Sequence, residues 1–305
     1  MTDPMQRRTG KRRGWGWGAL AVLVLGLLTT GAWFGVVKVR GSSMAPTLAD
    51  SDRVVVQKRA YGWFEHRLPE RGEVVVYSAP DNAEGDQIGR VVGLPGDSVS
   101  VQGGAVFVND FRIGTCVAGP TDLHAGAENY AGMVVVEIIG DNAYFVFHDV
   151  SALQQREGGH DHAEHEASDG HGHRGNVEGP YVVKENEVFV MGDNREHSDD
   201  SRSWFEKSGG GVRADRIKGR VSSVAFSVAE GGKPDWSRAG WSLTGTAKCP
   251  STLAAAVCEA ADRCIASRPA RETTLPPSVK AVSPLPALSA SAAQPVLTEP
   301  SVPSP

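Results

Sequence analysis

The sequence predicts a mainly β protein with one N-terminal transmembrane helix. After residue 52, short runs rich in Val, Ile and Phe alternate with Gly, Pro, Asn and Asp, a pattern typical of strands joined by turns. Before them, the 24 residues 14–37 carry no charge, and about 20 apolar residues suffice to cross the hydrocarbon layer. The chain has 305 residues, 40% of them hydrophobic, which is enough for a packed body beside this anchor.

The residues around the apolar segment predict its orientation. Five basic residues precede it within residues 1–13, and only Lys38 and Arg40 follow it directly. Because basic residues concentrate on the cytoplasmic side, we expect a single-pass protein of the cell (inner) membrane, with residues 1–13 in the cytoplasm and the body outside. A cleaved secretory signal is the alternative, but no Ala-x-Ala-like cleavage site ends the segment.

The strands of the body are expected at nine short runs. A hairpin is expected where Gly103 and Gly104 separate two of these runs, since glycine readily takes the positive φ angles of tight turns. The runs are residues 53–58, 73–78, 90–93, 98–102, 105–109, 133–139, 143–148, 187–191 and 220–226.

Four cysteines fall in the part of the chain expected outside the cytoplasm, where disulfides persist. Cys116, Cys249, Cys258 and Cys264 allow two disulfides in three pairings, and their spacing selects none of them. A structural zinc site is less favoured, because no two of them have the short gap of about two to four residues that such sites use. Three of the four lie in an extension, residues 229–266, whose Ala-rich part from residue 247 is expected to be helical.

Two segments have compositions that do not favour a packed structure. Residues 151–180 are rich in Gly, His, Asp and Glu and are expected to form an exposed, mobile loop. The Pro-, Ser- and Ala-rich tail, residues 267–305, is expected to be disordered. Imidazoles at this density can bind zinc, nickel or copper, so the loop is a candidate weak metal site, although a solvated insertion has the same composition. The histidines concerned are His160, His162, His165, His171 and His173.

The overall charge argues against one class of function. A net charge of −5 and a pI of about 6.0 give no general attraction to nucleic acid, so a nucleic-acid-binding protein is not expected. No cofactor is expected either.

A hydroxyl nucleophile is predicted directly after the anchor. Ser43 opens the segment Ser43-Met44-Ala45-Pro46-Thr47-Leu48. A serine hydroxyl is a poor nucleophile until a base takes its proton, and a buried lysine held neutral is one such base. Taken alone, a serine near a proline is more often an ordinary turn residue.

Three further regions give this serine a context. Residues 52–58 and 71–77 follow it, then Gly-Arg-Val-Val-Gly-Leu-Pro-Gly-Asp at 89–97, and finally Gly-Asp-Asn-Arg-Glu-His-Ser-Asp-Asp-Ser-Arg at 192–202. In this order the segments resemble the type I signal peptidases, serine peptidases of the Ser-Lys dyad type, from the anchor to about residue 226. The resemblance implies an antiparallel β-sheet catalytic body, residues 38–228, with a β-rich subdomain and the His-rich loop inserted.

The resemblance also implies roles for individual residues. Ser43 would be the nucleophile, its backbone N–H one oxyanion donor, and Met44 and Pro46 would contribute to substrate binding. Some members add a hydroxyl donor two residues before the nucleophile, where this chain has Gly41. Other residues would support the site. Ser198 would be the serine that contacts the dyad lysine, and Asp200 and Arg202 would form a charged pair beside Arg90. The turn that leads into this segment would be Gly192, Asp193 and Asn194.

The general-base lysine of the family has no counterpart. Gly89 stands where the family has this lysine, and neither a glycine nor the guanidinium of Arg90 accepts a proton. His197 is the most interesting replacement because it adjoins Ser198, and histidine is a residue type that commonly serves as a base. However, adjacent residues of an extended segment point to opposite faces, which favours an exposed His197. Lys58 and His148 are weaker candidates.

Three functions are compatible with these residues. The first is an active membrane-bound signal peptidase with a relocated base, which cleaves N-terminal signal peptides from exported preproteins. The second is an inactive relative that binds exported proteins or assists the assembly of surface structures, and the third is residual cleavage helped by a partner. We favour the enzyme, because the Ser43 segment and the supporting residues are complete. Its expected partners are preprotein signal peptides with small residues at the first and third positions before the cut, the bilayer and the export machinery.

Overall fold

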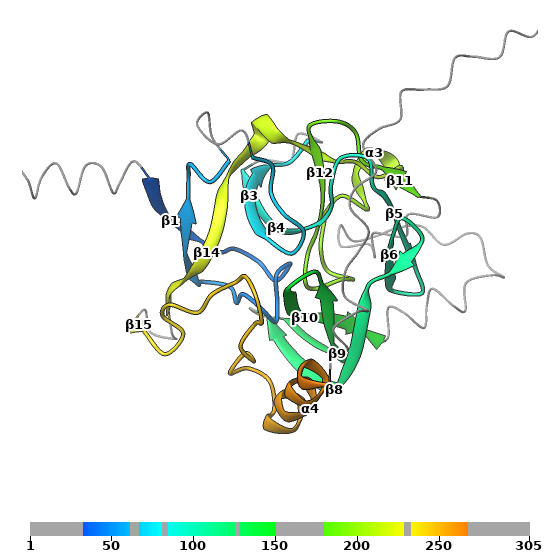
Figure 1. Cartoon of the computed structure of the whole chain (residues 1–305). Helices are drawn as coiled ribbons and strands as arrows, with labels where there is room; N and C mark the ends of the chain where they lie inside the picture. The colour runs from blue at the N-terminus through cyan, green and yellow to red at the C-terminus, as the bar shows by residue number, and fades with distance from the viewer. Residues whose placement is uncertain are drawn as a thin grey trace, which may run out of the picture.

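The computed structural model describes residues 33–61, 67–80, 85–125, 128–150, 180–228 and 233–267. In Figure 1 these residues form a large sheet with one smaller sheet beside it and another below it, where the C-terminal helix lies. The helical elements are α3 (Trp204–Lys207), the 3-10 turn η1 (Ala214–Arg216) and α4 (Ala255–Ala266). The prediction of a mainly β, antiparallel body is confirmed.

The largest sheet has eight strands and carries both chain segments that contain the predicted site. Seven strands follow in the order β1-β2-β14-β3-β4-β12-β13, and β15 pairs with β14. Each strand pair is antiparallel. The strands are β1 (Phe34–Lys38), β2 (Arg53–Gln57), β3 (Val74–Ser78), β4 (Asp86–Gly93), β12 (Glu187–Met191), β13 (Val212–Arg213), β14 (Ile217–Val228) and β15 (Pro234–Asp235).

The other two sheets are smaller and also antiparallel. The sheet below the large one has the order β10-β9-β8, and the sheet beside it has the order β11-β5-β6-β7. Gly103 and Gly104 take positive φ angles at the turn between β5 and β6, as the predicted hairpin requires. The strands are β5 (Ser98–Gln102), β6 (Ala105–Val108), β7 (Phe111–Arg112), β8 (Gly114–Ala125), β9 (Glu128–Ile139), β10 (Asn142–Asp149) and β11 (Tyr181–Val182).

Two groups of buried side chains meet at the segment that follows β1. The first, called here the sheet cluster, packs Met44 and Leu48 against inward-facing valines of β2, β3 and β14 and against Leu243. The second, the helix cluster, packs Ala45 against Phe145, Phe147 and residues of α4. Alternation in β2, where Val54 and Val56 are buried between partly exposed neighbours, is the pattern of a strand with one face on a core.

All nine predicted runs overlap observed strands, and six observed strands were not predicted. Four of these six, β7, β11, β13 and β15, have only two residues and no pattern to detect. The fifth, β8, contains Gly119 and Pro120 beside a register shift, and both residue types normally lower the expectation of a strand.

The predicted C-terminal boundary of the transmembrane segment is wrong. Residues Phe34–Lys38, of which 34–37 were included in the transmembrane segment, form β1 and pair with β2. A short apolar run such as Phe-Gly-Val-Val is compatible with either structure, and the pairing with β2 decides between them. The rest of the predicted anchor lies outside the described residues. Among the described residues, no helix is both long and apolar enough to cross a bilayer.

The cysteines form the disulfides Cys116–Cys264 and Cys249–Cys258. The first joins β8 to α4, and the second joins the segment before α4 to the helix itself. The helix predicted within 247–266 is confirmed, with its start at Ala255.

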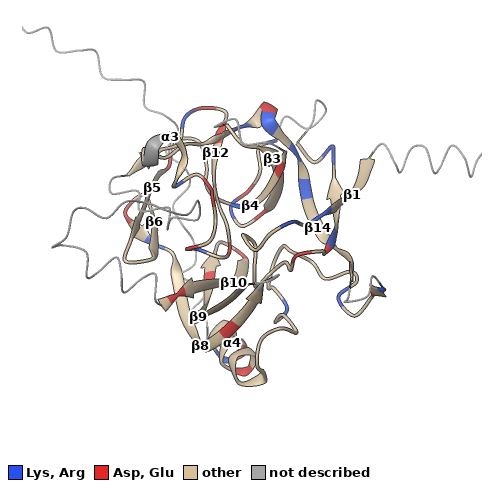
Figure 2. Ribbon diagram, turned by 180° about the vertical axis from the view of Figure 1, so that it is seen from behind, with Lys and Arg blue, Asp and Glu red and all other residues tan. Residues whose placement is uncertain are grey.

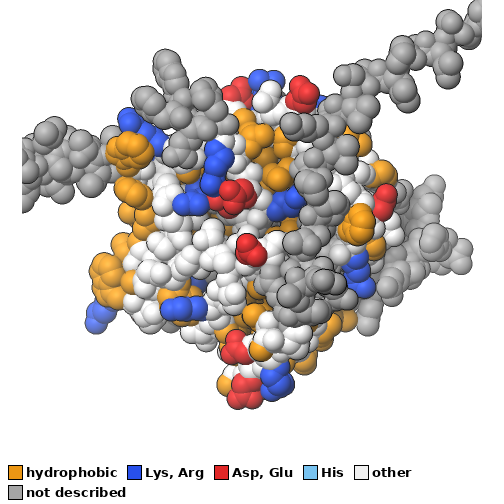
Figure 3. All heavy atoms as spheres, viewed as in Figure 1, with side chains coloured by type: hydrophobic (Ala, Val, Ile, Leu, Met, Phe, Trp, Pro, Cys, Tyr) orange, Lys and Arg blue, Asp and Glu red, His pale blue; other side chains and the backbone are white. Residues whose placement is uncertain are grey.

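Charged and hydrophobic side chains are distributed over the surface without one dominating sign. Figure 2 shows acidic and basic residues on the sheets and on α4, and on the face seen in Figure 3 hydrophobic patches lie between charged and polar side chains. Most of the predicted His-rich loop, residues 151–179, and nearly all of the predicted disordered tail, residues 268–305, lie outside the described residues.

Candidate active site

Ser43 lies in a compact turn between β1 and β2. The chain leaves β1 through Gly41, whose φ of +76° suits glycine and whose N–H donates to Asp50 (3.1 Å). It returns to β2 at Asp52, whose carbonyl accepts from the Val39 N–H (2.8 Å). The side chains of Met44 and Leu48 anchor the turn in the sheet cluster, and this leaves Ser43 half-buried at its edge.

The turn that follows β12 holds the backbone around Ser43. Asn194 donates its N–H to the Ser43 carbonyl (3.0 Å) and its Nδ2 to the Ser42 carbonyl (3.2 Å). Gly192 has no room for a side chain, because a Cβ there would overlap Ser198 Oγ and lie 2.6 Å from the Ser43 carbonyl oxygen. Ser43 and Ser198, 155 positions apart in the sequence, are therefore brought together around Gly192.

A buried carboxylate orients Ser198. Ser198 Oγ donates to Asp200 Oδ2 (2.5 Å), which also accepts the Gly192 N–H (2.8 Å). Arg202 forms a two-point ion pair with the same carboxylate (2.8 and 2.7 Å). Burial alone would raise the pKa of Asp200, but the charge and hydrogen bonds of Arg202 and the bond from Ser198 hold it below its ordinary value. Asp200 is therefore a fixed anion that accepts a hydrogen bond from the Ser198 hydroxyl.

Arg90 forms its own buried ion pair, for which no partner was predicted from the sequence. It makes a two-point ion pair with Asp193 (2.8 and 2.7 Å), donates to the Gly72 carbonyl (2.9 Å) and lies over the Tyr144 ring at 4.0 Å. The Asp200 and Arg202 pair is a separate unit. Arg90 thus ties β4 to the turn that holds the Ser43 backbone.

A third buried pair was missed from the sequence. Arg195 donates to both oxygens of Glu137 on β9 (2.5 and 2.6 Å) and to the Gly192 carbonyl (3.0 Å). Burial alone would raise the pKa of Glu137, but the Arg195 charge lowers it. The only available signal was a glutamate in the apolar run 134–139, at a position that needs a buried partner.

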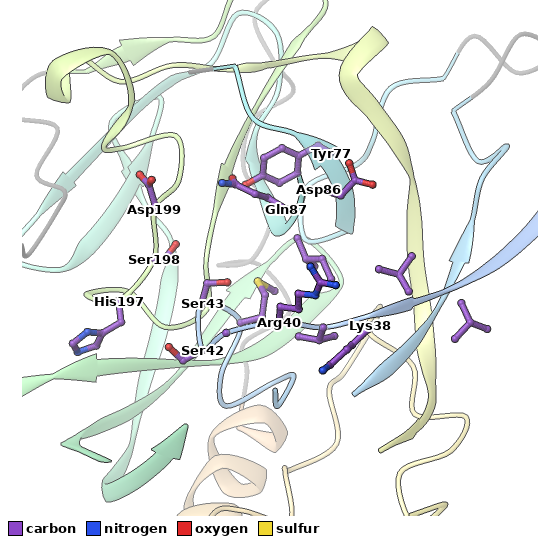
Figure 4. A pocket seen from close by; sticks show the side chains of 16 residues that line it. Lys38, Arg40, Ser42, Ser43, Tyr77, Asp86, Gln87, His197, Ser198 and Asp199 are labelled. Carbon is purple, nitrogen blue, oxygen red and sulfur yellow. The ribbon is translucent and has the colours of Figure 1, made fainter. Parts of the chain in front are cut away.

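His197 contacts Asp149 and Tyr130. Its Nε2 lies 3.0 Å from Asp149 Oδ2, and its ring stacks on Tyr130 with 3.9 Å between centroids. The neighbouring candidate His148 pairs with Glu196 (3.3 Å). In Figure 4 the His197 ring points away from Ser43, although both residues line one cavity.

That cavity has a volume of about 680 Å³ and is open along one side. Figure 4 shows Ser43 and Ser198 on one wall, with Tyr77 and Gln87 on the next. The remaining wall comes from β1 and the residues after it, including Lys38 and Arg40. Of the two predicted substrate-binding residues, Met44 lines the cavity and Pro46 does not. Lys58 does not line it either, and its side chain lies against Gly35 of β1.

Gly89 lies on β4, and the ring of Tyr77 packs directly against it. A Cβ on Gly89 would lie 3.2 Å from Tyr77 Cε1, 3.3 Å from the Tyr77 hydroxyl and 3.4 Å from Val190 Cβ. Tyr77 is 1% exposed and packs edge-on against Trp204. Even a Cβ at position 89 would therefore press on Tyr77, which would have to shift by a few tenths of an ångström.

No metal centre is found in the part of the chain that the structure describes, where no three His, Cys, Asp or Glu side chains are placed to share an ion. The His-rich tract proposed for that role lies outside this part.

Comparison with known proteins finds one family. Residues 12–226 match the family described as signal peptidase, peptidase S26. The chain is 28% identical over 221 residues to a signal peptidase I of Pseudomonas fluorescens, covering 67% of this chain and 69% of that protein. It is 29% identical over 214 residues to signal peptidase I P of Bacillus subtilis subsp. natto, covering 70% and 87%. Among solved structures, a signal peptidase I from Enterococcus faecalis matches 51% of this chain and 98% of its own, at 21% identity and a TM-score of 0.27.

Proposed function

The chain belongs to the signal peptidase family, peptidase S26, whose function is the cleavage of signal peptides, and we propose that Ser43 is its nucleophile. The observation that carries this proposal is the convergence of Ser43 and Ser198 around Gly192 on the wall of one open cavity. A serine peptidase site requires a nucleophilic hydroxyl, a base that takes its proton and a groove that admits the substrate, and Ser43 on the wall of the open cavity meets the first and the last of these.

The substrate binds as an extended chain between two strand edges. Among the described residues, β1 pairs with β2 alone, and residues 86–89 of β4 pair with β3 alone. Both free edges line the cavity, so both offer backbone N–H and C=O groups to a peptide that adds itself as a strand. Gln87 Oε1, buried there without a hydrogen-bond partner among the described residues, is available to a substrate N–H.

Cleavage proceeds by acyl transfer. Ser43 Oγ attacks the carbonyl carbon before the cut and loses its proton to a base, while the carbonyl electrons move onto oxygen. The C–N bond then breaks, the base returns the proton to the leaving amine, and the signal peptide stays as an ester on Ser43. Water hydrolyses this ester with the same base. The Ser43 backbone N–H stabilises the oxyanion. Gly41 has no hydroxyl that could serve as a second donor.

The base is not at position 89. We infer that Gly89 stands in the place of the family lysine, and the packing of Tyr77 against Gly89 supports a site adapted to its absence. We assign the base role to His197, because Asp149 fixes its Nε2 and both His197 and Ser43 line the cavity. With Nε2 held by Asp149, His197 takes the Ser43 proton on its other ring nitrogen through one bridging water.

The body works at a membrane surface. The family is typically membrane-anchored, and we propose that residues 14–32 cross the inner membrane with the N-terminus in the cytoplasm. Trp33 and Phe34, directly after this segment, are 49% and 46% exposed, which suits the bilayer interface. Exported preproteins delivered by the export machinery would reach the cavity from that side.

Incubation of the full-length protein in detergent with an Ala-x-Ala preprotein tests this function. We expect cleavage at the signal sequence, and none with Ser43→Ala. Preprotein that is captured but left intact by the wild type would instead support a binding protein. Cleavage that survives Ser43→Ala would reject Ser43 as the nucleophile.

A further inference from the structure

The C-terminal extension, residues 233–267, lies beyond the matched family segment, which ends at residue 226, yet it touches the Ser43 turn on two sides. Leu243 and Trp241 pack with Met44 and Leu48 in the sheet cluster. On the other side, Ala45 packs in the helix cluster with Leu253 and Val257. The residues directly after Ser43 are thus held between two parts of one extension.

Arg238 connects the extension to this turn by hydrogen bonds. Its Nη2 donates to the Thr47 carbonyl (2.6 Å) and its Nη1 to Asp52 Oδ2 (2.7 Å). Arg238 is 6% exposed and Asp52 is fully buried. A guanidinium presents several donors in a rigid plane, so one side chain fixes the distance between Thr47 and Asp52, the last turn before β2.

Asp52 also forms hydrogen bonds to an earlier part of the turn and to β14. Asp52 Oδ2 also accepts the Ala49 N–H (3.0 Å), and Asp52 Oδ1 accepts the Ser227 hydroxyl (2.5 Å) from β14. Removal of the guanidinium would leave a buried carboxylate with fewer donors and the Thr47 carbonyl without this one. The backbone from 44 to 52 would then be free to relax.

Covalent bonds hold the extension itself in place. Cys116–Cys264 joins α4 to β8, and Cys249–Cys258 closes the segment before α4. In addition, the Ala247 N–H donates to the Ala143 carbonyl of β10 (2.8 Å). The extension is therefore a fixed support rather than an appended tail.

We propose that this extension positions the nucleophile, and that Arg238 is the positioning residue through which it holds the Ser43 turn. The proposal rests on the proposed function of Ser43. A displacement of about 1 Å at a reacting group can lower a rate by about 100-fold, so a modest relaxation of the turn has a measurable effect on kcat. Substrate contacts from β1 and β4 would not change, so KM should stay nearly constant.

The test compares Arg238→Lys with Arg71→Lys in the full-length protein. Arg71 also pairs with a buried carboxylate, through two points on Asp97, and neither Arg71 nor Asp97 lines the cavity. We expect both variants to unfold at lower temperature, but only Arg238→Lys to lower kcat for a preprotein, by about 10-fold with KM within about twofold. Equal kcat in the two variants would overturn the positioning role.

A milder variant covers the case in which Arg238→Lys does not fold. Leu243→Val removes one methylene from the packing on Met44 and Leu48, and we expect a several-fold loss of kcat. An unchanged kcat in Leu243→Val would contradict the proposal. Wild-type cleavage that depends on Ser43 is measured first, so a failure of the proposed function appears in the wild type and a failure of this inference only in the variants.

Discussion

The hydroxyl of Tyr77 lies 3.3 Å from the point that a Cβ on Gly89 would occupy. Two sites on neighbouring strands are thereby linked, because a Cβ at position 89 would require the buried Tyr77 ring to shift by a few tenths of an ångström. The absence of a side chain at 89 and the presence of a tyrosine at 77 are two parts of one packing solution.

A lysine at position 89 should therefore work only when Tyr77 is reduced in size. We expect Gly89→Lys alone to lower the unfolding temperature without raising activity. Gly89→Lys with Tyr77→Ala should exceed the cleavage rate of Tyr77→Ala by about 10-fold or more, since general-base catalysis typically contributes at least about 100-fold. Preprotein cleavage rates measure this. Equal rates for the double variant and Tyr77→Ala would reject the assignment of position 89.

Gly192→Ala should abolish most activity. The added Cβ would overlap Ser198 Oγ and crowd the Ser43 carbonyl, so the Ser198 side chain and the Ser43 backbone must move apart. We expect kcat to fall by about 100-fold, measured on a preprotein. Gly114→Ala is the matched control, because its Cβ would meet nothing closer than 3.7 Å, and its kcat should not change. A similar kcat in both variants would mean that Gly192 does not set the site geometry.

His197→Gln should reduce cleavage at neutral pH if His197 is the base. Glutamine keeps a hydrogen-bond donor for Asp149 but cannot take a proton, so we expect kcat to fall by about 100-fold. His124→Gln, which changes an exposed histidine bonded to Asn129, is the control. A kcat that is unchanged by His197→Gln would move the base role to another group.

The buried carboxylates predict loss of stability in acid. Glu137 and Asp200 have pKa values below their ordinary values of 4.5 and 3.8, so the unfolded chain binds more protons than the folded one at acidic pH. Their contribution is present above about pH 4.5 and is lost as the pH falls through the folded-state values. Denaturant unfolding as a function of pH measures this.

The variant Glu137→Gln distinguishes the contribution of Glu137 to stability from that of Asp200. It leaves the Arg195 guanidinium buried without an anion, which typically costs about 3–5 kcal/mol at neutral pH, and the decline in acid should become shallower. An acid decline as steep as in the wild type would exclude Glu137 as a contributor.

The residues of the site were predictable from sequence to the extent that they lie in short contiguous segments. Ser43 with Met44, and Gly192 with Ser198, stand out because turn formers and hydroxyls are crowded together there. Their roles in catalysis are still predictions. The strands with clear alternation or apolar runs, such as β2 and β10, were also predictable, because side-chain period reports which face is buried.

The partners of buried charges were not predictable. Arg90 pairs with Asp193 and Arg195 with Glu137, 103 and 58 residues away, and each arginine has several carboxylates in the sequence that would satisfy it equally well. The cysteine pairing is the same problem, since spacing left three solutions open. Only the three-dimensional path of β8 and α4 selects Cys264 as the partner of Cys116.

That bond also determines what a protease could do to this protein. Cys116 and Cys264 are separated by 148 positions, an interval that contains the His-rich tract and the whole of residues 192–202. A single nick anywhere in this interval produces two polypeptides that stay covalently attached until a reductant is added. The nucleophile and the supporting turn would therefore stay covalently joined after a cut anywhere between Cys116 and residue 192.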